Sequence, residues 1–272
     1  MVESKFDWKV GLVIVMGKMK NDSLGMRMKE YEAVSNIKVT RRMPLVMRFD
    51  GCSFHSFTKG FNKPFDEILM KTMQQTMEAL CKDIQGCVFG YTQSDEITLI
   101  LVDYQTLETS AWFDNKVQKM CSVGASKASR YFNKFFIDNV GLAMADPTNK
   151  DIDFSKYTRR FFTADFDCRA FNVPKEDVCN CVIWRQKDAE RNSVQMLAQS
   201  MYPHKELMGI SCKQLQNKMF TEKDVNWNDL PTPCKRGSAC KKNEEGKWYI
   251  DYDMPILTEN RAYVEDLIYV GE

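Results

Sequence analysis

Apolar residues in this chain recur with two different spacings, which predict strands and helices in alternation. Short continuous apolar runs bounded by turn residues are typical of strands buried in a sheet. Runs that read as strands lie at residues 43–49, 87–91, 97–102 and 160–173. Apolar residues at intervals of three and four predict amphipathic helices. The stretches read as helices lie at residues 64–84, 107–136 and 174–201.

The predicted order is β-α-β-β-α-β, the split arrangement of ferredoxin-like domains and polymerase palms. We therefore expect an α+β fold with an antiparallel sheet and additional C-terminal helices and loops, including a strand at 247–252 and a short helix near 259–268. In this topology the third strand lies antiparallel beside the first. Asp50, at the end of the first strand, then meets Asp95, at the tip of the 92–96 hairpin.

Two carboxylates at converging strand ends suit a site for two Mg²⁺ ions, which prefer oxygen ligands and promote phosphoryl transfer. Gly51 would let the backbone approach closely and would offer its carbonyl as a ligand. The backbone amides of residues 51–55 could cradle phosphate oxygens. The alternative is that Asp-Gly and Ser-Asp-Glu are only turn sequences. Their predicted meeting point favours the metal site.

Composition is compatible with a globular enzyme but does not identify one. A chain of 272 residues with 44% hydrophobic content can bury one sizeable core. The formal net charge is +1, so charge alone does not predict RNA binding. Tyr131, Phe132 and Phe135 could stack on bases, but their helical spacing favours a place in the core. We expect a variable extension at 1–22, a catalytic domain at 23–210 and a C-terminal extension at 211–272.

The cysteine pattern favours a reducing compartment. The ten cysteines lack the paired spacing of a zinc site or a disulfide framework, so we expect free thiols in the cytoplasm. The apolar stretch at 10–16 is too short to span a membrane, and no membrane association is expected.

Five short motifs, in order from about Leu24 to Ser238, resemble those of the tRNA(His) guanylyltransferases and, more closely, the bacterial and archaeal Thg1-like proteins. The motifs are Arg48-Phe49-Asp50-Gly51 with Phe54-His55-Ser56-Phe57-Thr58-Lys59, Lys63-Pro64-Phe65-Asp66, Tyr91-Thr92-Gln93-Ser94-Asp95-Glu96, Trp184-Arg185-Gln186 with Asp188, and Lys235-Arg236-Gly237-Ser238. The resemblance implies a polymerase-like palm that adds nucleotides at a 5′ end.

The resemblance also implies roles for single residues. Asp50, Asp95 and the Gly51 carbonyl would hold two Mg²⁺ ions, and Glu96 would complete the catalytic acids. The residues implied to bind nucleotide are Gly51, Cys52, Ser53, Phe54, His55, Lys59, Ser94, Lys116 and Lys119. Lys116 and Lys119 also have the i, i+3 spacing that places them on one face of a helix. The alternative to nucleotide binding is that this is only a solvated basic face.

One segment departs from the family pattern. Members that act specifically on tRNA(His) carry His-Ile-Asn-Asn where this chain has Glu190-Arg191-Asn192-Ser193. This favours template-dependent repair of 5′-truncated tRNA, with ATP or GTP activating the 5′-monophosphate and nucleoside triphosphates as substrates. Guanosine addition to tRNA(His) stays open, and the family implies a homotetramer. The alternatives are a nucleotidyl cyclase-like palm enzyme and a non-catalytic RNA-binding relative.

Overall fold

The computed structural model describes residues 23–271, and the chain divides into two units after Ile37. The described part of the first unit contains one helix, α2 (Ser23–Ala33), in which no residue is buried. The extension expected at 1–22 lies outside the described residues. The second unit, which begins at Lys38, holds all the other described helices and strands.

A six-stranded antiparallel sheet forms the centre of this second unit, with the order β4-β1-β3-β2-β5-β6. Its strands are β1 (Leu45–Gly51), β2 (Cys87–Gln93), β3 (Glu96–Leu101), β4 (Phe166–Asn172), β5 (Ser238–Lys242) and β6 (Trp248–Asp251). β1 lies between β3 and β4, and Asp50 is opposite Glu96 on one side and Asp167 on the other. The predicted antiparallel pairing of the first and third strands is therefore confirmed.

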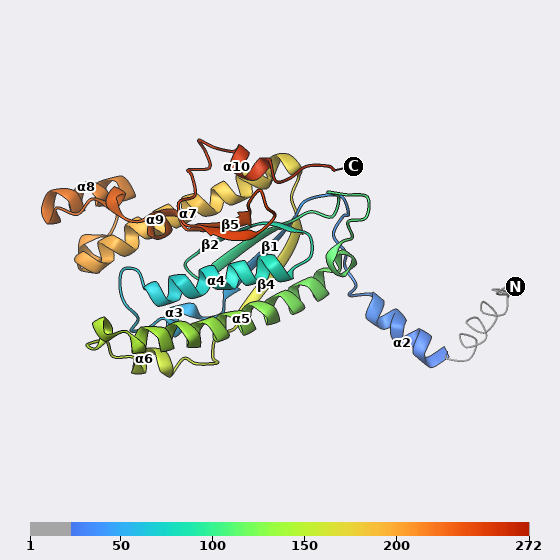
Figure 1. The fold of residues 1–272 in the computed structure, drawn as a ribbon, viewed down its shortest axis with the longest axis horizontal. Helices are drawn as coiled ribbons and strands as arrows, with labels where there is room; N and C mark the ends of the chain where they lie inside the picture. The colour runs from blue at the N-terminus through green and yellow to red at the C-terminus, as the bar shows by residue number, and fades with distance from the viewer. Residues whose placement is uncertain (1–22, 272) are drawn as a thin grey trace, which may run out of the picture. The chain divides into compact units, whose positions relative to one another are not determined.

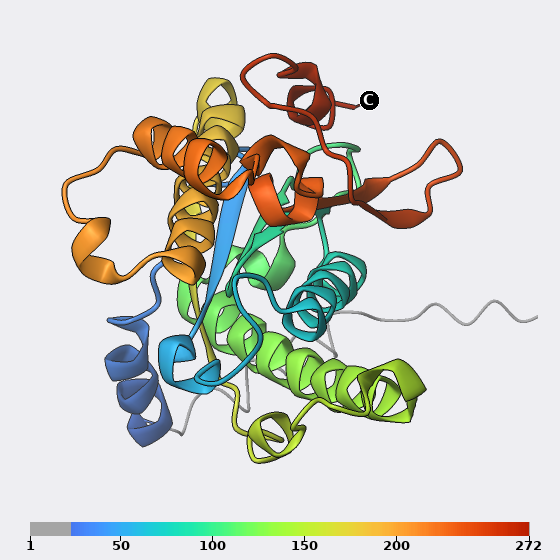
Figure 2. The same ribbon diagram turned by 90° about the vertical axis from the view of Figure 1, so that its left-hand side faces the viewer.

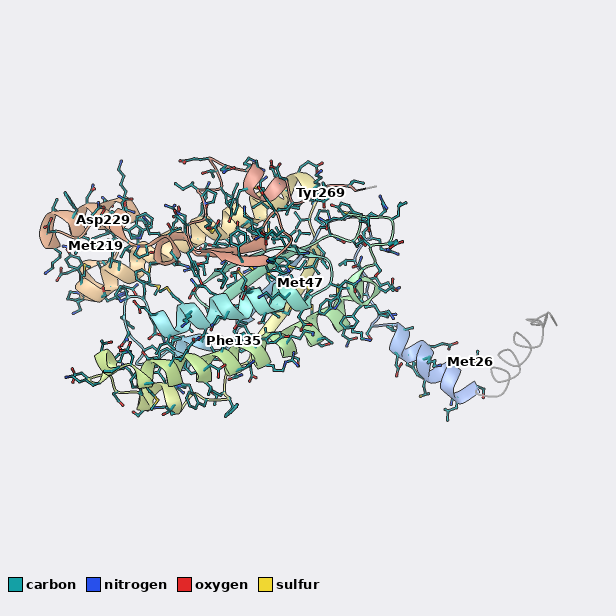
Figure 3. The ribbon with its side chains drawn as sticks, in the orientation of Figure 1. Met26, Met47, Phe135, Met219, Asp229 and Tyr269 are labelled. Carbon is teal, nitrogen blue, oxygen red and sulfur yellow. The ribbon has the colours of Figure 1, made fainter. Side chains whose placement is uncertain are left out.

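Helices cover both faces of the sheet (Figures 1 and 2). α4 (Glu67–Asp83) and α5 (Val117–Ala145) lie on one face, where Met47 and Phe49 pack with Phe132 in the main core. Met47 lies in the interior (Figure 3). α7 (Lys175–Met201) and α10 (Ala262–Glu265) lie on the opposite face. There Tyr91 and Ile100 form a second core with apolar residues of α7.

Shorter elements complete the unit. They are α3 (Phe54–Phe57), η1 (Trp112–Asn115), η2 (Pro147–Asn149), α6 (Ser155–Thr158), η3 (His204–Glu206), α8 (Cys212–Lys223), η4 (Trp227–Asp229) and α9 (Thr232–Arg236). The second half of α7 carries α8 and η4 on a third apolar cluster that includes Met219 (Figure 3). None of the helices in the described part of the chain combines the length and apolar character of a membrane span.

Two predicted elements begin well after the expected residue, and the first of them also extends beyond its expected end, to Ala145. The helix expected at 107–136 begins ten residues later, at Val117, because Phe113, Asp114 and Asn115 have positive φ angles of 50°, 54° and 56° that no helix continues through. The strand expected at 160–173 begins only at Phe166 and is preceded by turns. Phe132 is buried, as its helical spacing predicted.

Candidate active site

The ends of β1 and β3 bring the two predicted catalytic acids together. The amide of Gly51 donates a hydrogen bond to the backbone carbonyl of Asp95, at 3.1 Å. The hairpin between β2 and β3 turns at Ser94, whose φ is 54°. Asp50 thus lies beside a two-residue turn that presents Asp95, although the two acids are far apart in the sequence.

The electrostatics of these acids favour a bound cation. Burial raises the pKa of Asp50, and the neighbouring carboxylates of Glu96 and Asp167 raise it further. Burial also raises the pKa of Asp95, with repulsion from Asp50 and Glu96 acting in the same direction, while a hydrogen bond from Ser94 partly offsets the rise. Carboxylates that repel each other in this way are stabilised when a cation lies between them.

The oxygen ligands that this site offers suit a hard cation that keeps some of its own water ligands. In residues 23–271 no group of three or more His, Cys, Asp or Glu side chains converges as a complete metal site. Two carboxylates and the Gly51 carbonyl would leave positions for water and substrate phosphate, which is the usual manner of Mg²⁺ binding. A Cβ atom at residue 51 would lie 2.3 Å from the Phe54 ring, so only glycine is accommodated there.

The loop after β1 offers unpaired amides beside the acids. The Cys52 amide already donates to the carbonyl of Asp165, at 2.8 Å. Among the described residues, none accepts a hydrogen bond from the amides of Ser53, Phe54 and His55. Ser53 has the left-handed conformation and helical residues follow it, and such a turn aims successive amides at one point. The Phe54 ring is buried against Phe57, Phe132 and Phe166 and anchors the loop.

A cavity of about 350 Å³ opens beside this loop. Four of the predicted site residues line it, and they are Phe54, His55, Ser94 and Asp95. The other lining residues are Thr58, Phe61, Asn62, Lys63, Pro64, Phe65, Asp66, Leu69, Met70, Met73, Gln74, Thr92, Gln93, Met196, Pro233, Cys234, Gly237 and Ser238. The volume lies in the range of small-molecule sites in proteins.

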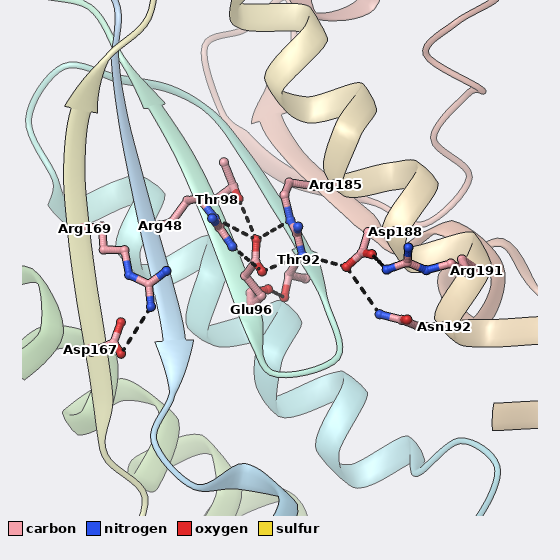
Figure 4. A network of polar contacts seen from close by, with 10 residues as sticks. All are labelled: Arg48, Thr92, Glu96, Thr98, Asp167, Arg169, Arg185, Asp188, Arg191 and Asn192. Atoms are coloured by element: carbon pink, nitrogen blue, oxygen red, sulfur yellow. Dashed lines mark hydrogen bonds and ion pairs between the residues drawn. The ribbon is translucent and has the colours of Figure 1, made fainter. Parts of the chain in front are cut away.

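Glu96 is held by two arginines (Figure 4). Arg48 donates from Nε to Oε1 (3.1 Å) and from Nη2 to Oε2 (2.8 Å), and Arg185 Nη2 donates to Oε2 (2.7 Å). Because both oxygens accept hydrogen bonds from arginines, Glu96 is suited to fix the strand ends, and its place among the catalytic acids stays a prediction. Asp66 is likewise occupied, since it accepts hydrogen bonds from the amides of Asn62 and Leu69 and from the Tyr157 hydroxyl.

Comparison with known proteins decides the family. The family model described as tRNAHis guanylyltransferase matches residues 25–174. The chain belongs to this family. Its members are nucleotidyltransferases, so the protein is an enzyme of that class.

A relative and two solved structures support the assignment. An uncharacterized protein of Acanthamoeba polyphaga mimivirus is 30% identical over 236 residues, covering 82% of this chain and 78% of the relative. The structure of a bacterial tRNA(His) guanylyltransferase (Thg1)-like protein in complex with ATP has 41% identity and a TM-score of 0.81, covering 91% of this chain and 100% of the other. A bacterial Thg1-like protein in complex with GTP has 36% identity and a TM-score of 0.73, with the same coverage.

The segment Glu190-Arg191-Asn192-Ser193 has structural roles in this chain. Asp188 accepts hydrogen bonds from Arg185 (3.1 Å), Asn192 (3.4 Å) and Arg191 (Figure 4). Ser193 is buried, donates to the Cys234 carbonyl (2.6 Å) and accepts from the Trp227 indole (2.9 Å). Hydrogen bonds through Asp188 and Arg185 therefore connect this segment to Glu96 at the start of β3.

Three lysines that the family resemblance assigned to nucleotide lie outside the cavity lining. Lys59 is exposed after α3. Lys116 precedes α5 as its N-cap, with a ψ of 108°, so only Lys119 of the expected pair lies within the helix. Lys119 packs over the Phe113 ring. Lys116 and Lys119 lie near the Leu45 end of β1, and Asp50 lies at the other end. Two contacts with the segment before β1 give this placement. Lys116 forms a β-bridge with Lys38, and the Asn115 carbonyl accepts a hydrogen bond from the Val39 amide.

Asp167 is a site residue that the sequence analysis missed. It is directly opposite Asp50 across the β1–β4 pair, is exposed, and raises the pKa of Asp50. The only sequence signal was an acid within the predicted fourth strand, at 160–173, and its importance depends on a register that the sequence does not reveal.

Proposed function

We propose that the protein is a 3′-to-5′ nucleotidyltransferase that adds nucleotides to the 5′ end of tRNA. The observation that carries this proposal is the convergence of Asp50 and Asp95 beside three unpaired amides and a nucleotide-sized cavity. The ATP and GTP held by the similar bacterial proteins support a nucleoside triphosphate as the occupant.

Asp50, Asp95 and the Gly51 carbonyl are the residues that would hold two Mg²⁺ ions. When bound, such ions lower the pKa of an attacking hydroxyl and neutralise charge on the transferred phosphoryl group. The amides of Ser53, Phe54 and His55 bind triphosphate oxygens, the Ser94 hydroxyl adds a further contact, and the cavity receives the nucleoside.

The reaction proceeds in two displacements. The 5′-monophosphate of the RNA attacks the α-phosphorus of ATP or GTP, which forms a 5′–5′ linkage and releases pyrophosphate. The 3′-hydroxyl of an incoming nucleoside triphosphate then attacks the activated 5′-phosphorus, which forms the new phosphodiester and releases the nucleoside monophosphate. A 5′-triphosphate end needs no activation.

The substrate within this proposal is 5′-truncated tRNA, repaired by base pairing to the opposite strand of the acceptor stem. This rests on Glu190-Arg191-Asn192-Ser193, in which Ser193 is committed to internal hydrogen bonds. Guanosine addition to tRNA(His) is a second product to be measured. The family resemblance further supports a homotetramer in the cytoplasm, and light scattering tests the assembly.

The test is incubation of 5′-truncated tRNA with ATP, the four nucleotides and Mg²⁺, followed by sizing of the product. Monophosphorylated RNA should be extended only with ATP or GTP present, and triphosphorylated RNA without activation. Asp50→Ala and Asp95→Ala should abolish extension, whereas Asp83→Ala, which removes an acid from the end of α4 that binds Lys127, should retain it. Extension by both active-site variants at ordinary Mg²⁺ would contradict the proposal.

A further inference from the structure

A single amide group lies in the otherwise largely apolar wall that α4 gives to the cavity. Gln74 of α4 is 8% exposed, and its Nε2 donates a hydrogen bond to the Ser238 hydroxyl of β5, at 2.9 Å. Ser238 is 1% exposed. Both residues line the cavity together with Asp95, and the nearby α4 residues Leu69, Met70 and Met73 are apolar.

The other half of this amide has no partner. No residue in the described part of the chain donates to Gln74 Oε1. Gln74 Oε1 is not fully enclosed by protein, so part of its surface is accessible. Because Gln74 lines the cavity, the cavity is the space that this oxygen can reach. An amide that is more than nine-tenths buried and only half satisfied needs a partner from the cavity, either water or a ligand group.

The chemistry around Gln74 matches a nucleobase. Apolar side chains accommodate a flat ring, and a glutamine amide is a common partner for the polar edge of a purine. Three of the proposed triphosphate contacts, Phe54, His55 and Ser94, line the same cavity, as does the proposed metal ligand Asp95. A nucleotide held by its phosphates there extends its base into the space that Gln74 lines.

We propose that Gln74 reads the base of the activating nucleotide and that Ser238 sets the orientation of its amide. This inference rests on the proposed function, because it assigns the cavity to that nucleotide. A serine hydroxyl can accept or donate, so the Gln74 amide can present either its carbonyl oxygen or its amino group to the base. The site therefore accepts both adenine and guanine, whose facing edges carry different donors and acceptors.

The first variant is Gln74→Met, which keeps the length of the side chain and removes its hydrogen bonds. Binding of ATP and of GTP, measured by calorimetry without RNA, should weaken by about 3- to 10-fold, the effect of one lost neutral hydrogen bond. Inorganic tripolyphosphate, which has no base, should bind the variant as it binds the native protein. Gln75→Met is the matched control, because Gln75 is the next residue of α4, accepts from Asn139 at 2.7 Å and does not line the cavity.

The second variant, Gln74→Glu, fixes the group as an acceptor. Guanine offers two adjacent donors and adenine fewer, so the ratio of GTP to ATP affinity should rise. Equal losses for tripolyphosphate and ATP, or unchanged affinities and an unchanged ratio in both variants, would overturn the inference. A native protein that binds ATP but extends no RNA would contradict the proposed function instead, so the two failures are distinguishable.

Discussion

Arg185 should control both stability and the ionisation of the catalytic acids. Its side chain is 12% exposed and joins Glu96, at 13% exposure, to Asp188. Arg185→Ala leaves Glu96 with Arg48 alone. Breaking a fully buried ion pair costs about 3–5 kcal/mol and an exposed pair about 0–1 kcal/mol. For this largely enclosed pair we expect about 2–3 kcal/mol, which a domain of ordinary stability survives.

The same change should reach the chemistry through Glu96. This residue follows Asp95 and is opposite Asp50, and its negative charge already raises the pKa of both acids. With less positive charge beside Glu96, the pKa of both acids should rise further, so the acid limb of the pH–rate profile should move to higher pH. Displacement of the strand ends should lower kcat by about 10- to 100-fold.

Two measurements separate these effects. Urea denaturation gives the change in the free energy of unfolding, and nucleotide addition across a pH series gives the profile. Arg185→Lys keeps the charge and should largely restore the profile, although it loses the forked hydrogen bonds. Arg191→Ala, at a side chain 61% exposed, should change neither quantity by much. A destabilised Arg185→Ala protein with the native pH profile would refute the coupling.

Three further outcomes are expected. Asp50→Asn and Asp95→Asn should each abolish activity yet raise the free energy of unfolding at neutral pH. The pKa of each carboxyl is raised in the native protein, so its ionisation destabilises the native protein as the pH rises through that pKa. In urea titrations the gain in the free energy of unfolding should therefore vanish in acid. Replacing Lys116 and Lys119 by Ala should leave the KM for ATP unchanged under conditions where the chain is monomeric, since both lie near the end of β1 that is away from Asp50. An increase in the KM for ATP would contradict this placement. Truncated tRNAs for histidine and for other amino acids should be repaired with comparable efficiency in a product-sizing assay, and repair confined to tRNA(His) would contradict the role given to the segment that ends at Ser193.

The acid pair could be predicted because local signals and topology agree. Asp50 follows an apolar run, Asp95 follows a polar turn sequence, and the split order of elements makes those strands neighbours. The late start of α5 could not be predicted, because three consecutive non-glycine residues at 113–115 take positive φ angles for which the sequence carries no clear signal. The place of Asp167 beside Asp50 and the hydrogen bond between Gln74 and Ser238 could not be predicted either, since each is a contact between segments distant in the sequence.

The cavity is assembled from two parts of the chain, and only one of them lies within the stretch that the family model matches. The acids and the amide-bearing loop lie inside residues 25–174, the stretch that matches the family model. The opposite wall, with Met196, Cys234, Gly237 and Ser238, lies beyond it. Substitutions in the C-terminal part can therefore reshape one wall of the cavity while Asp50, Asp95 and Gln74 stay unchanged. Residues 231–242 supply four lining residues of that wall, so exchanging this segment between relatives measures how far the wall affects nucleotide preference.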